Sequence, residues 1–269
     1  MTDPMPAGAA ALYRRDGESF VPEPNAAGPW DAGLQAGGSM AALLAHAAEA
    51  VPTPCEMVPV RTTIDLMRPA PMAPTQARTQ VLREGRKLQL LRAELVQGDR
   101  VLASATVLRL RAGDNPADRN APPPTPPALA PEAGELMDDK VRARNPMLMA
   151  LEMRFVTPDF RQPGPATAWV RLLHPIVAGC ANTPYMQVAI CADLGAGMSS
   201  IVGFRDWTRI NADVSIHLNR LPRGAWLAVD ARTESTGNGI GQVLCTLFDR
   251  EGHIGWTHQS VLIERRSQR

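Results

Sequence analysis

Residues 78–111 alternate between apolar and polar side chains, and the alternation is interrupted only by Glu-Gly-Arg at 84–86 and Gln-Gly-Asp at 97–99. A period of two predicts β-strands, because successive side chains of a strand point to opposite faces of the sheet. Turns this short leave no room for the crossover connection that parallel strands require. The sequence therefore predicts long antiparallel strands joined by hairpins.

The same succession of elements occurs twice in the chain. An apolar segment at 37–50 precedes strands that begin at 60–69, and a second apolar segment at 183–197 precedes alternating residues at 209–222 and 224–266. Turns are expected in the last of these ranges at Thr-Gly-Asn and at Arg-Glu-Gly-His. An internal repeat of about 150 residues is the simplest interpretation.

Both apolar segments predict short helices that are buried nearly all round. In the first, only His46 and Glu49 are strongly polar, and in the second Asp193 is the sole charged residue. Surface helices carry a polar face, which these segments lack. Thr183 suits the N-cap of the second helix, and Pro184 suits its first position. His46 and Glu49 are interpreted as a pair at the exposed end of the first helix.

The composition changes near the middle of the chain. Residues 113–135 are rich in proline and nearly free of large apolar side chains, which favours an extended linker over a helix or central strand. We expect an N-terminal domain at 1–112, a linker at 113–144 and a C-terminal domain at 145–269.

Charge and cysteine content narrow the classes of function. With 28 Lys and Arg against 27 Asp and Glu, the net charge of +1 makes no electrostatic case for nucleic acid or an anionic membrane. No apolar run approaches the ~18 residues of a membrane helix, and no signal peptide is expected at the start. The cysteines are too widely spaced for a metal site. A soluble, cytoplasmic protein is predicted, and its cysteines are expected to be reduced: Cys55, Cys180, Cys191 and Cys245.

Residues 210–219 alternate without a break and place Asp213 among polar neighbours on one strand face. Taken alone, Asp213 is more readily a solvated strand residue than part of a site. His217 lies on the same face and is interpreted as a structural or surface histidine.

Four segments resemble the acyl-CoA thioesterase II type of thioesterase: GPWDAGLQAGGSMAALLAHAAE (28–49), NADVSIHL (211–218), ARTESTGNG (231–239) and GWTHQSVLI (255–263). The resemblance covers most of the chain. It implies an α+β double hotdog, in which two curved antiparallel sheets are each wrapped round a central helix. The chain departs from the family at Gln35, where relatives often carry His, and after the strand that bears Asp213.

The resemblance also implies a catalytic site. Asp213, Thr236 and Gln259 would hold one water that attacks the thioester, and Ser235 could take the place of Thr236 if the turn is shorter. No covalent nucleophile, metal or organic cofactor is required. A backbone N–H would bind the developing oxyanion, either at Gly37 and Gly38, where the first helix begins, or around residues 182–185.

The repeat adds an argument about the number of sites. The positions in the first half that correspond to Asp213, Thr236 and Gln259 are approximately Arg61, Glu84 and Thr106. Because an arginine cannot replace the aspartate, we expect one active site per chain, with part of its acyl pocket from the first half.

The resemblance implies hydrolysis of an acyl-CoA thioester to a free acid and CoA, a reaction of lipid metabolism. One alternative is a non-catalytic acyl-thioester binding protein, and a less favoured one is a hotdog enoyl-CoA hydratase. Hotdog proteins commonly assemble by symmetric contacts, so we expect a homo-oligomer, a dimer or higher.

Overall fold

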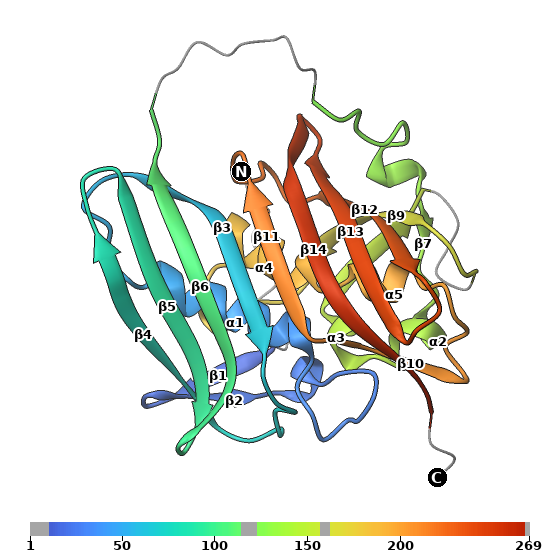
Figure 1. Cartoon of the computed structure of the whole chain (residues 1–269), viewed down its shortest axis with the longest axis horizontal. Coiled ribbons are helices and arrows are strands. Elements are labelled where there is room, and N and C mark those ends of the chain that lie inside the picture. Colours follow the sequence, from blue (N-terminus) through green and yellow to red (C-terminus); the bar gives the residue numbers. More distant parts are fainter. Residues whose placement is uncertain (1–10, 114–122, 157–161, 267–269) are drawn as a thin grey trace.

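The computed structural model describes residues 11–113, 123–156 and 162–266. Within these ranges the strands form one 14-stranded sheet (Figure 1), and every pairing between its strands is antiparallel. The first half contributes β1 (Tyr13–Asp16), β2 (Ser19–Pro22), α1 (Gly37–Glu49), β3 (Met57–Leu66), β4 (Thr75–Glu84), β5 (Leu88–Gln97) and β6 (Arg100–Arg111). The hairpins expected at 84–86 and 97–99 join β4, β5 and β6.

The second half repeats this succession after short additional elements. Its strands are β7 (Glu135–Leu136), β8 (Leu151–Phe155), β9 (Ala166–Leu172), β10 (Trp207–Asn211), β11 (Asp213–Leu218), β12 (Leu227–Ser235), β13 (Ile240–Asp249) and β14 (Gly252–Arg265). Its helices are α2 (Asp139–Arg142), α3 (Pro146–Met149), α4 (Pro184–Ala192) and α5 (Gly195–Met198). The strand β7 and the helix α2 lie within the predicted linker. Residues 114–122 of that linker are outside the described ranges. The domain limits at 112 and 145 stay predictions.

The strand order reveals how the halves are related. It runs β1-β2-β4-β5-β6-β3 in the first half and continues β11-β14-β13-β12-β9-β8 in the second, which is the same order reversed. At the junction, Arg61 pairs with His217 and Asp65 pairs with Asp213. This register is the one that a twofold axis requires if Arg61 corresponds to Asp213, as the sequence repeat predicts. The two expected sheets are therefore joined edge to edge, because β3 and β11 pair.

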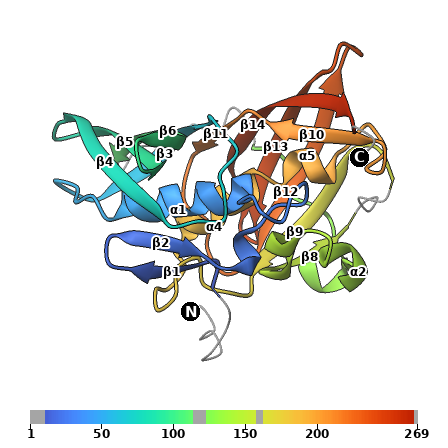
Figure 2. The same ribbon diagram turned by 90° about the horizontal axis from the view of Figure 1, so that it is seen from below.

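The helices α1 and α4 pack against each other on one side of the sheet (Figure 2). All but a few residues of both helices are buried, as their apolar composition predicts. Thr183 is the N-cap of α4, where its hydroxyl accepts a hydrogen bond from the backbone N–H of Met186 at 3.1 Å, and Pro184 follows as the first helical residue. The largest core cluster contains residues of both halves.

The uninterrupted alternation expected at 210–219 is wrong. The strand breaks at Ala212, whose N–H donates to Ser260 and whose carbonyl accepts from Leu66. Before the break Arg209 is buried and Ile210 is 46% exposed, whereas after it the even-numbered Val214 is buried. Because Ala212 is outside the alternation, the inward-facing positions are odd-numbered before it and even-numbered after it. Arg209 and Asn211 therefore point inward.

All four cysteines are free thiols. Among the described residues, no helix is long and apolar enough to cross a membrane.

Candidate active site

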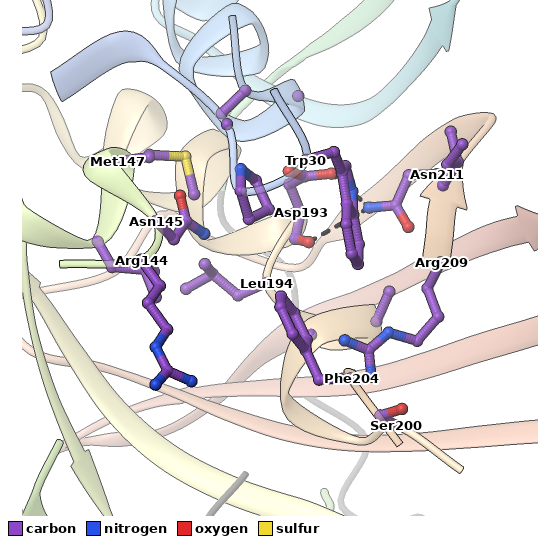
Figure 3. Close-up of a pocket in the computed structure, with 18 of the residues that line it drawn as sticks. Trp30, Arg144, Asn145, Met147, Asp193, Leu194, Ser200, Phe204, Arg209 and Asn211 are labelled. Atoms are coloured by element: carbon purple, nitrogen blue, oxygen red, sulfur yellow. Dashed lines mark hydrogen bonds between the residues drawn. The ribbon is translucent and has the colours of Figure 1, made fainter. Parts of the chain in front are cut away.

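A cavity of about 810 Å³ lies between the two halves of the chain (Figure 3). One wall is formed by residues 28–37 and 66–70, and the other by residues from 137–153 and 193–211. Most of the lining is apolar, and it is unusually rich in methionine: Met40, Met67, Met137, Met147, Met153 and Met198. Methionine side chains are flexible and adapt to irregular apolar surfaces, so these walls suit a chain-like apolar ligand.

Asp193 places a carboxyl group on the wall of this cavity. It is the C-cap of α4, and its Oδ1 accepts a hydrogen bond from the side-chain amide of Asn211. Burial raises the pKa of Asp193 to about 6, while hydrogen bonds from Asn211 and from the backbone N–H of Gly38 act in the opposite direction. A carboxyl group with this pKa can exchange a proton near neutral pH.

The carboxyl group of Asp193 lies against the N-terminus of the other half's helix. A Cβ added to Gly37 would stand 2.9 Å from Asp193 Oδ1 and 3.0 Å from Leu66 Cδ1, so only glycine leaves room for this approach. The first backbone N–H groups of α1 have no partner inside the helix, and they form the positive end of its dipole. The site therefore combines a carboxyl group of the second half with backbone donors of the first.

Gln259 supports the turn that carries Asp193. It is 1% exposed on the inner face of β14, where its amide donates to the carbonyl of Ala192 and its Oε1 accepts from the N–H of Ala196 at 3.1 Å. These bonds connect to both sides of the segment between α4 and α5. The same segment approaches β13 closely at Gly195, where a Cβ would stand 2.5 Å from Cys245 Sγ.

The structure does not bring Asp213, Thr236 and Gln259 together. Ser215 pairs with His258, so Asp213 lies opposite Ser260, and its Oδ1 accepts from the Ser260 N–H at 2.8 Å. Gln259 is the next residue along β14 and points to the other face of the sheet. None of the three lines the cavity.

Ser235 is the last residue of β12, Thr236 follows it in the turn to β13, and both are exposed. The hydroxyl of Ser235 donates to the carbonyl of Ile240 at 2.6 Å and accepts from the N–H of Gly237 at 3.2 Å, which stabilises the turn. Of the predicted substrate-binding residues, Gly37 lines the cavity, whereas Gly38 and Ser235 do not.

Side-chain hydrogen bonds also occur at the opposite end of the helix pair. Glu49 accepts a hydrogen bond from the Thr183 hydroxyl at 2.6 Å, and the hydroxyl groups of Tyr185 and Thr62 lie 2.5 Å apart. Nearby, Arg109 donates to the carbonyl of Val51 at 2.9 Å. Thus Glu49, the carboxylate at the end of α1, contacts the start of α4 much as Asp193 contacts the start of α1, but Glu49 is exposed and does not line the cavity.

Sequence reasoning did not select Asp193 or Asn211 as site residues. The signal for Asp193 was present, because it is the only charged residue in an otherwise apolar helical segment. Asn211 could not be placed, since its direction depends on the break at Ala212.

Both halves of the chain match models of one protein family. A family model described as the acyl-CoA thioesterase N-terminal domain matches residues 26–110, and one described as the acyl-CoA thioesterase C-terminal domain matches residues 116–263. Among curated proteins, no sequence matches significantly.

Solved structures share the fold at low sequence identity. A putative thioesterase II from Thermobifida fusca is 19% identical with a TM-score of 0.75, and the match covers 97% of this chain and 99% of that one. A protein of unknown function with a hot dog fold from Alicyclobacillus acidocaldarius is 15% identical, with a TM-score of 0.70 and 96% of each chain covered. The tesB protein of Mycobacterium avium subsp. paratuberculosis is 19% identical, with a TM-score of 0.68 and coverage of 94% and 95%. The chain therefore has a hotdog fold.

Proposed function

The chain belongs to the acyl-CoA thioesterase family, and we propose that it hydrolyses an acyl-CoA thioester to a free acid and CoA at Asp193. The duplicated strand order and the paired helices support the finer description of the fold as a double hotdog, with α1 and α4 as its central helices. The observation that carries the proposal is the carboxyl group of the half-buried Asp193, held against the start of α1 on the wall of an apolar cavity.

In this proposal Asp193 is the general base. A carboxylate with a pKa of about 6 is ionised at neutral pH and is a stronger base than an exposed aspartate. It takes a proton from a water, and the water oxygen attacks the thioester carbonyl. Asn211 orients the carboxylate through its amide.

The oxyanion that forms on the carbonyl needs a hydrogen-bond donor. The Gly37 backbone N–H lies at the first turn of α1 beside the cavity, where the positive end of the helix dipole adds to its effect. The other segment considered, residues 182–185, does not line the cavity, which favours Gly37. The thiolate of CoA then leaves and takes a proton from solvent or from Asp193.

Asp213 and Gln259 have different roles in this proposal. Gln259 is a positioning residue, because it binds the backbone on both sides of Asp193. The alternative, in which Asp213 holds the water together with Thr236, requires these side chains to reach the substrate from outside the cavity.

The test is hydrolysis of a panel of acyl-CoAs of different chain length, with the released thiol measured. We expect turnover by the wild type, a loss of roughly 10²–10⁴-fold in kcat for Asp193→Asn, and little change for Asp213→Asn or Thr236→Ala. Loss of activity in Asp213→Asn with retention in Asp193→Asn would move the site to Asp213.

Two outcomes would reject hydrolysis altogether. Tight binding of acyl-CoA without turnover of any chain length favours a non-catalytic binding protein. Hydration of crotonyl-CoA without thiol release favours a hydratase.

A further inference from the structure

Two aromatic rings from different halves of the chain stack beside the cavity. Trp30 precedes α1, Phe204 lies between α5 and β10, and their ring centroids are 5.1 Å apart with an angle of 18° between the planes. Both residues line the cavity (Figure 3), as do Asp193 and Asn211. The pair is therefore part of the substrate cavity rather than of the closed core.

Two arginines lie against this aromatic pair. The guanidinium carbon of Arg209 is 5.9 Å from the centre of the Trp30 ring and 5.0 Å from that of Phe204, and for Arg266 the distances are 5.0 and 5.2 Å. Cation–π contacts of this kind offset part of the cost of removing a guanidinium from water. They leave its N–H donors free, because the rings offer no hydrogen-bond acceptor.

The guanidinium of Arg209 is buried without a carboxylate partner. The residue is 7% exposed and lines the cavity, its Nε has no hydrogen-bond partner, and one terminal nitrogen makes a long bond of 3.5 Å to the carbonyl of Val202. The Nε of Arg266 is buried and unpartnered as well. Among the described residues, neither arginine forms an ion pair, although Asp31 and Asp206 also line the cavity.

Two adjacent cations without an anion are electrostatically unfavourable. Burial, with a further contribution from Arg266, lowers the pKa of Arg209 to about 10, so its guanidinium stays charged at neutral pH. A buried charge that lacks a counterion carries a large desolvation cost, which a bound anion would offset.

The strand break directs this charge toward the reaction centre. Arg209 and Asn211 are two residues apart on β10 and therefore project from the same face, roughly 7 Å apart along the strand. Asn211 binds Asp193, the proposed base. An anion held by Arg209 would thus belong to the same ligand as the thioester carbonyl that the water activated by Asp193 attacks.

We propose that Arg209 on the cavity wall, together with Arg266 against the same two rings, forms an anion subsite that binds a charged oxygen group of the thioester substrate. This inference rests on the proposed function, because it specifies the substrate of that site. Guanidinium groups bind phosphates and carboxylates through the same paired N–H donors. The anion is either a phosphate of CoA or a terminal carboxylate on the acyl group.

Calorimetric titration of the Asp193→Asn variant tests binding separately from turnover. The probes are CoA, pantetheine, which lacks its phosphates, and adipate as a free dicarboxylate. In this background we expect Arg209→Gln and Arg266→Gln to weaken binding of the preferred anion about tenfold or more. Arg205→Gln is the matched control, because Arg205 lines the same cavity but is exposed.

The probes distinguish the two sources of the anion. Weaker binding of CoA with unchanged binding of pantetheine assigns the subsite to a phosphate, whereas weaker binding of adipate assigns it to a carboxylate. The subsite is overturned if Arg209→Gln and Arg266→Gln bind every probe as tightly as the protein that keeps both arginines. It is also overturned if Arg205→Gln loses as much affinity as they do. If Arg209→Gln does not fold, Arg209→Lys replaces it, because lysine keeps the positive charge but lacks the paired N–H donors of a guanidinium group. Unchanged binding of the preferred anion by both Arg209→Lys and Arg266→Gln then overturns the proposal.

Turnover by the otherwise wild-type enzyme separates this inference from the proposed function. We expect Arg209→Gln to lower kcat/KM for acyl-CoA, or for the acyl-CoA of a dicarboxylic acid, more than for the uncharged acyl-N-acetylcysteamine. An equal loss on charged and uncharged thioesters contradicts the subsite. Absence of turnover in the wild type together with arginine-dependent anion binding rejects hydrolysis but leaves the subsite standing.

Discussion

At the scale of single residues, opposing forces act on the carboxyl group of Asp193. Burial disfavours its charged form, whereas hydrogen bonds from Asn211 and Gly38 favour it, and the balance leaves the pKa near 6. An exposed aspartate would be ionised throughout the neutral range but would be a weaker base. Burial is therefore what makes this residue suitable for proton transfer.

The pH dependence of hydrolysis follows from that pKa. Because the base acts only when it is ionised, kcat/KM should rise about tenfold per pH unit below pH 6 and level off above about pH 7. The measurement is kcat/KM for one acyl-CoA between pH 5 and pH 8.5. A profile without an inflection between pH 5 and 7 would contradict the role of Asp193.

The same pKa predicts an effect on stability. The folded protein binds the Asp193 proton more tightly than the unfolded chain, whose pKa is near 3.8, so the cost of burying the charge is absent below that value and complete above about pH 6. Asp193→Asn removes this cost. We expect its free energy of unfolding to exceed that of the wild type by about 1–3 kcal/mol at pH 8 and to be nearly equal at pH 4, measured by urea unfolding at both pH values.

Gly37 should be intolerant of any side chain. In Gly37→Ala the new methyl group would collide with Asp193 Oδ1 and Leu66 Cδ1, so the carboxylate must move from the start of α1. We expect kcat to fall at least tenfold, with a smaller effect on the thermal midpoint. Gly197→Ala is the control, because Gly197 also lines the cavity and a Cβ there meets nothing within 4 Å; comparable losses in both variants would argue against this explanation.

At the scale of elements, the segment between α4 and α5 and the break before β11 build the site. The segment between α4 and α5 places Asp193 at the end of α4, and Gln259 holds its backbone through two hydrogen bonds. The break before β11 turns Arg209 and Asn211 inward. Asp193 stands out in the sequence as the only charged residue of its apolar helical segment, whereas nothing in the length or composition of residues 209–213 indicates the break.

The N-cap of α4 gives a prediction for a whole element. Thr183→Ala removes the hydrogen bond to the Met186 N–H and the one to Glu49, so unfolding free energy should fall by about 1 kcal/mol. Thr236→Ala changes an exposed threonine in a turn and should stay within about 0.5 kcal/mol of the wild type. Equal stability of the two variants in urea unfolding would mean that the cap contributes nothing.

At the scale of the whole molecule, the pairing of β3 with β11 makes one sheet of two halves. Ile64 lies at this seam opposite Val214 and is 1% exposed. Ile64→Ala should lower the free energy of unfolding by about 2–5 kcal/mol, whereas Leu82→Ala, at a position 40% exposed, should have a much smaller effect. Far-UV circular dichroism and tryptophan fluorescence should report the same lowered midpoint, since the core crosses the seam; separate midpoints would show that the halves unfold independently.

Short stretches of the sequence suffice to predict the local features of the fold. Alternation and turn length specify the hairpins of β4 to β6 and β12 to β14, apolar composition specifies two buried helices, and the residue types at Thr183 and Pro184 specify a helix start. These signals suffice because each depends on neighbours within a few residues. The repeat was visible for the same reason, since each half carries the full set of local signals.

Which side chains share the cavity depends on helix packing and strand register. Asp193 meets Gly37 because α1 and α4 pack side by side, and Asp213 turns away from Gln259 because the register of β11 on β14 sets it opposite Ser260. A shift of one residue in a strand exchanges its faces, and the break at Ala212 makes such a shift without any local signal. Contacts between distant segments depend on packing and register, which the order of residues along one strand does not contain.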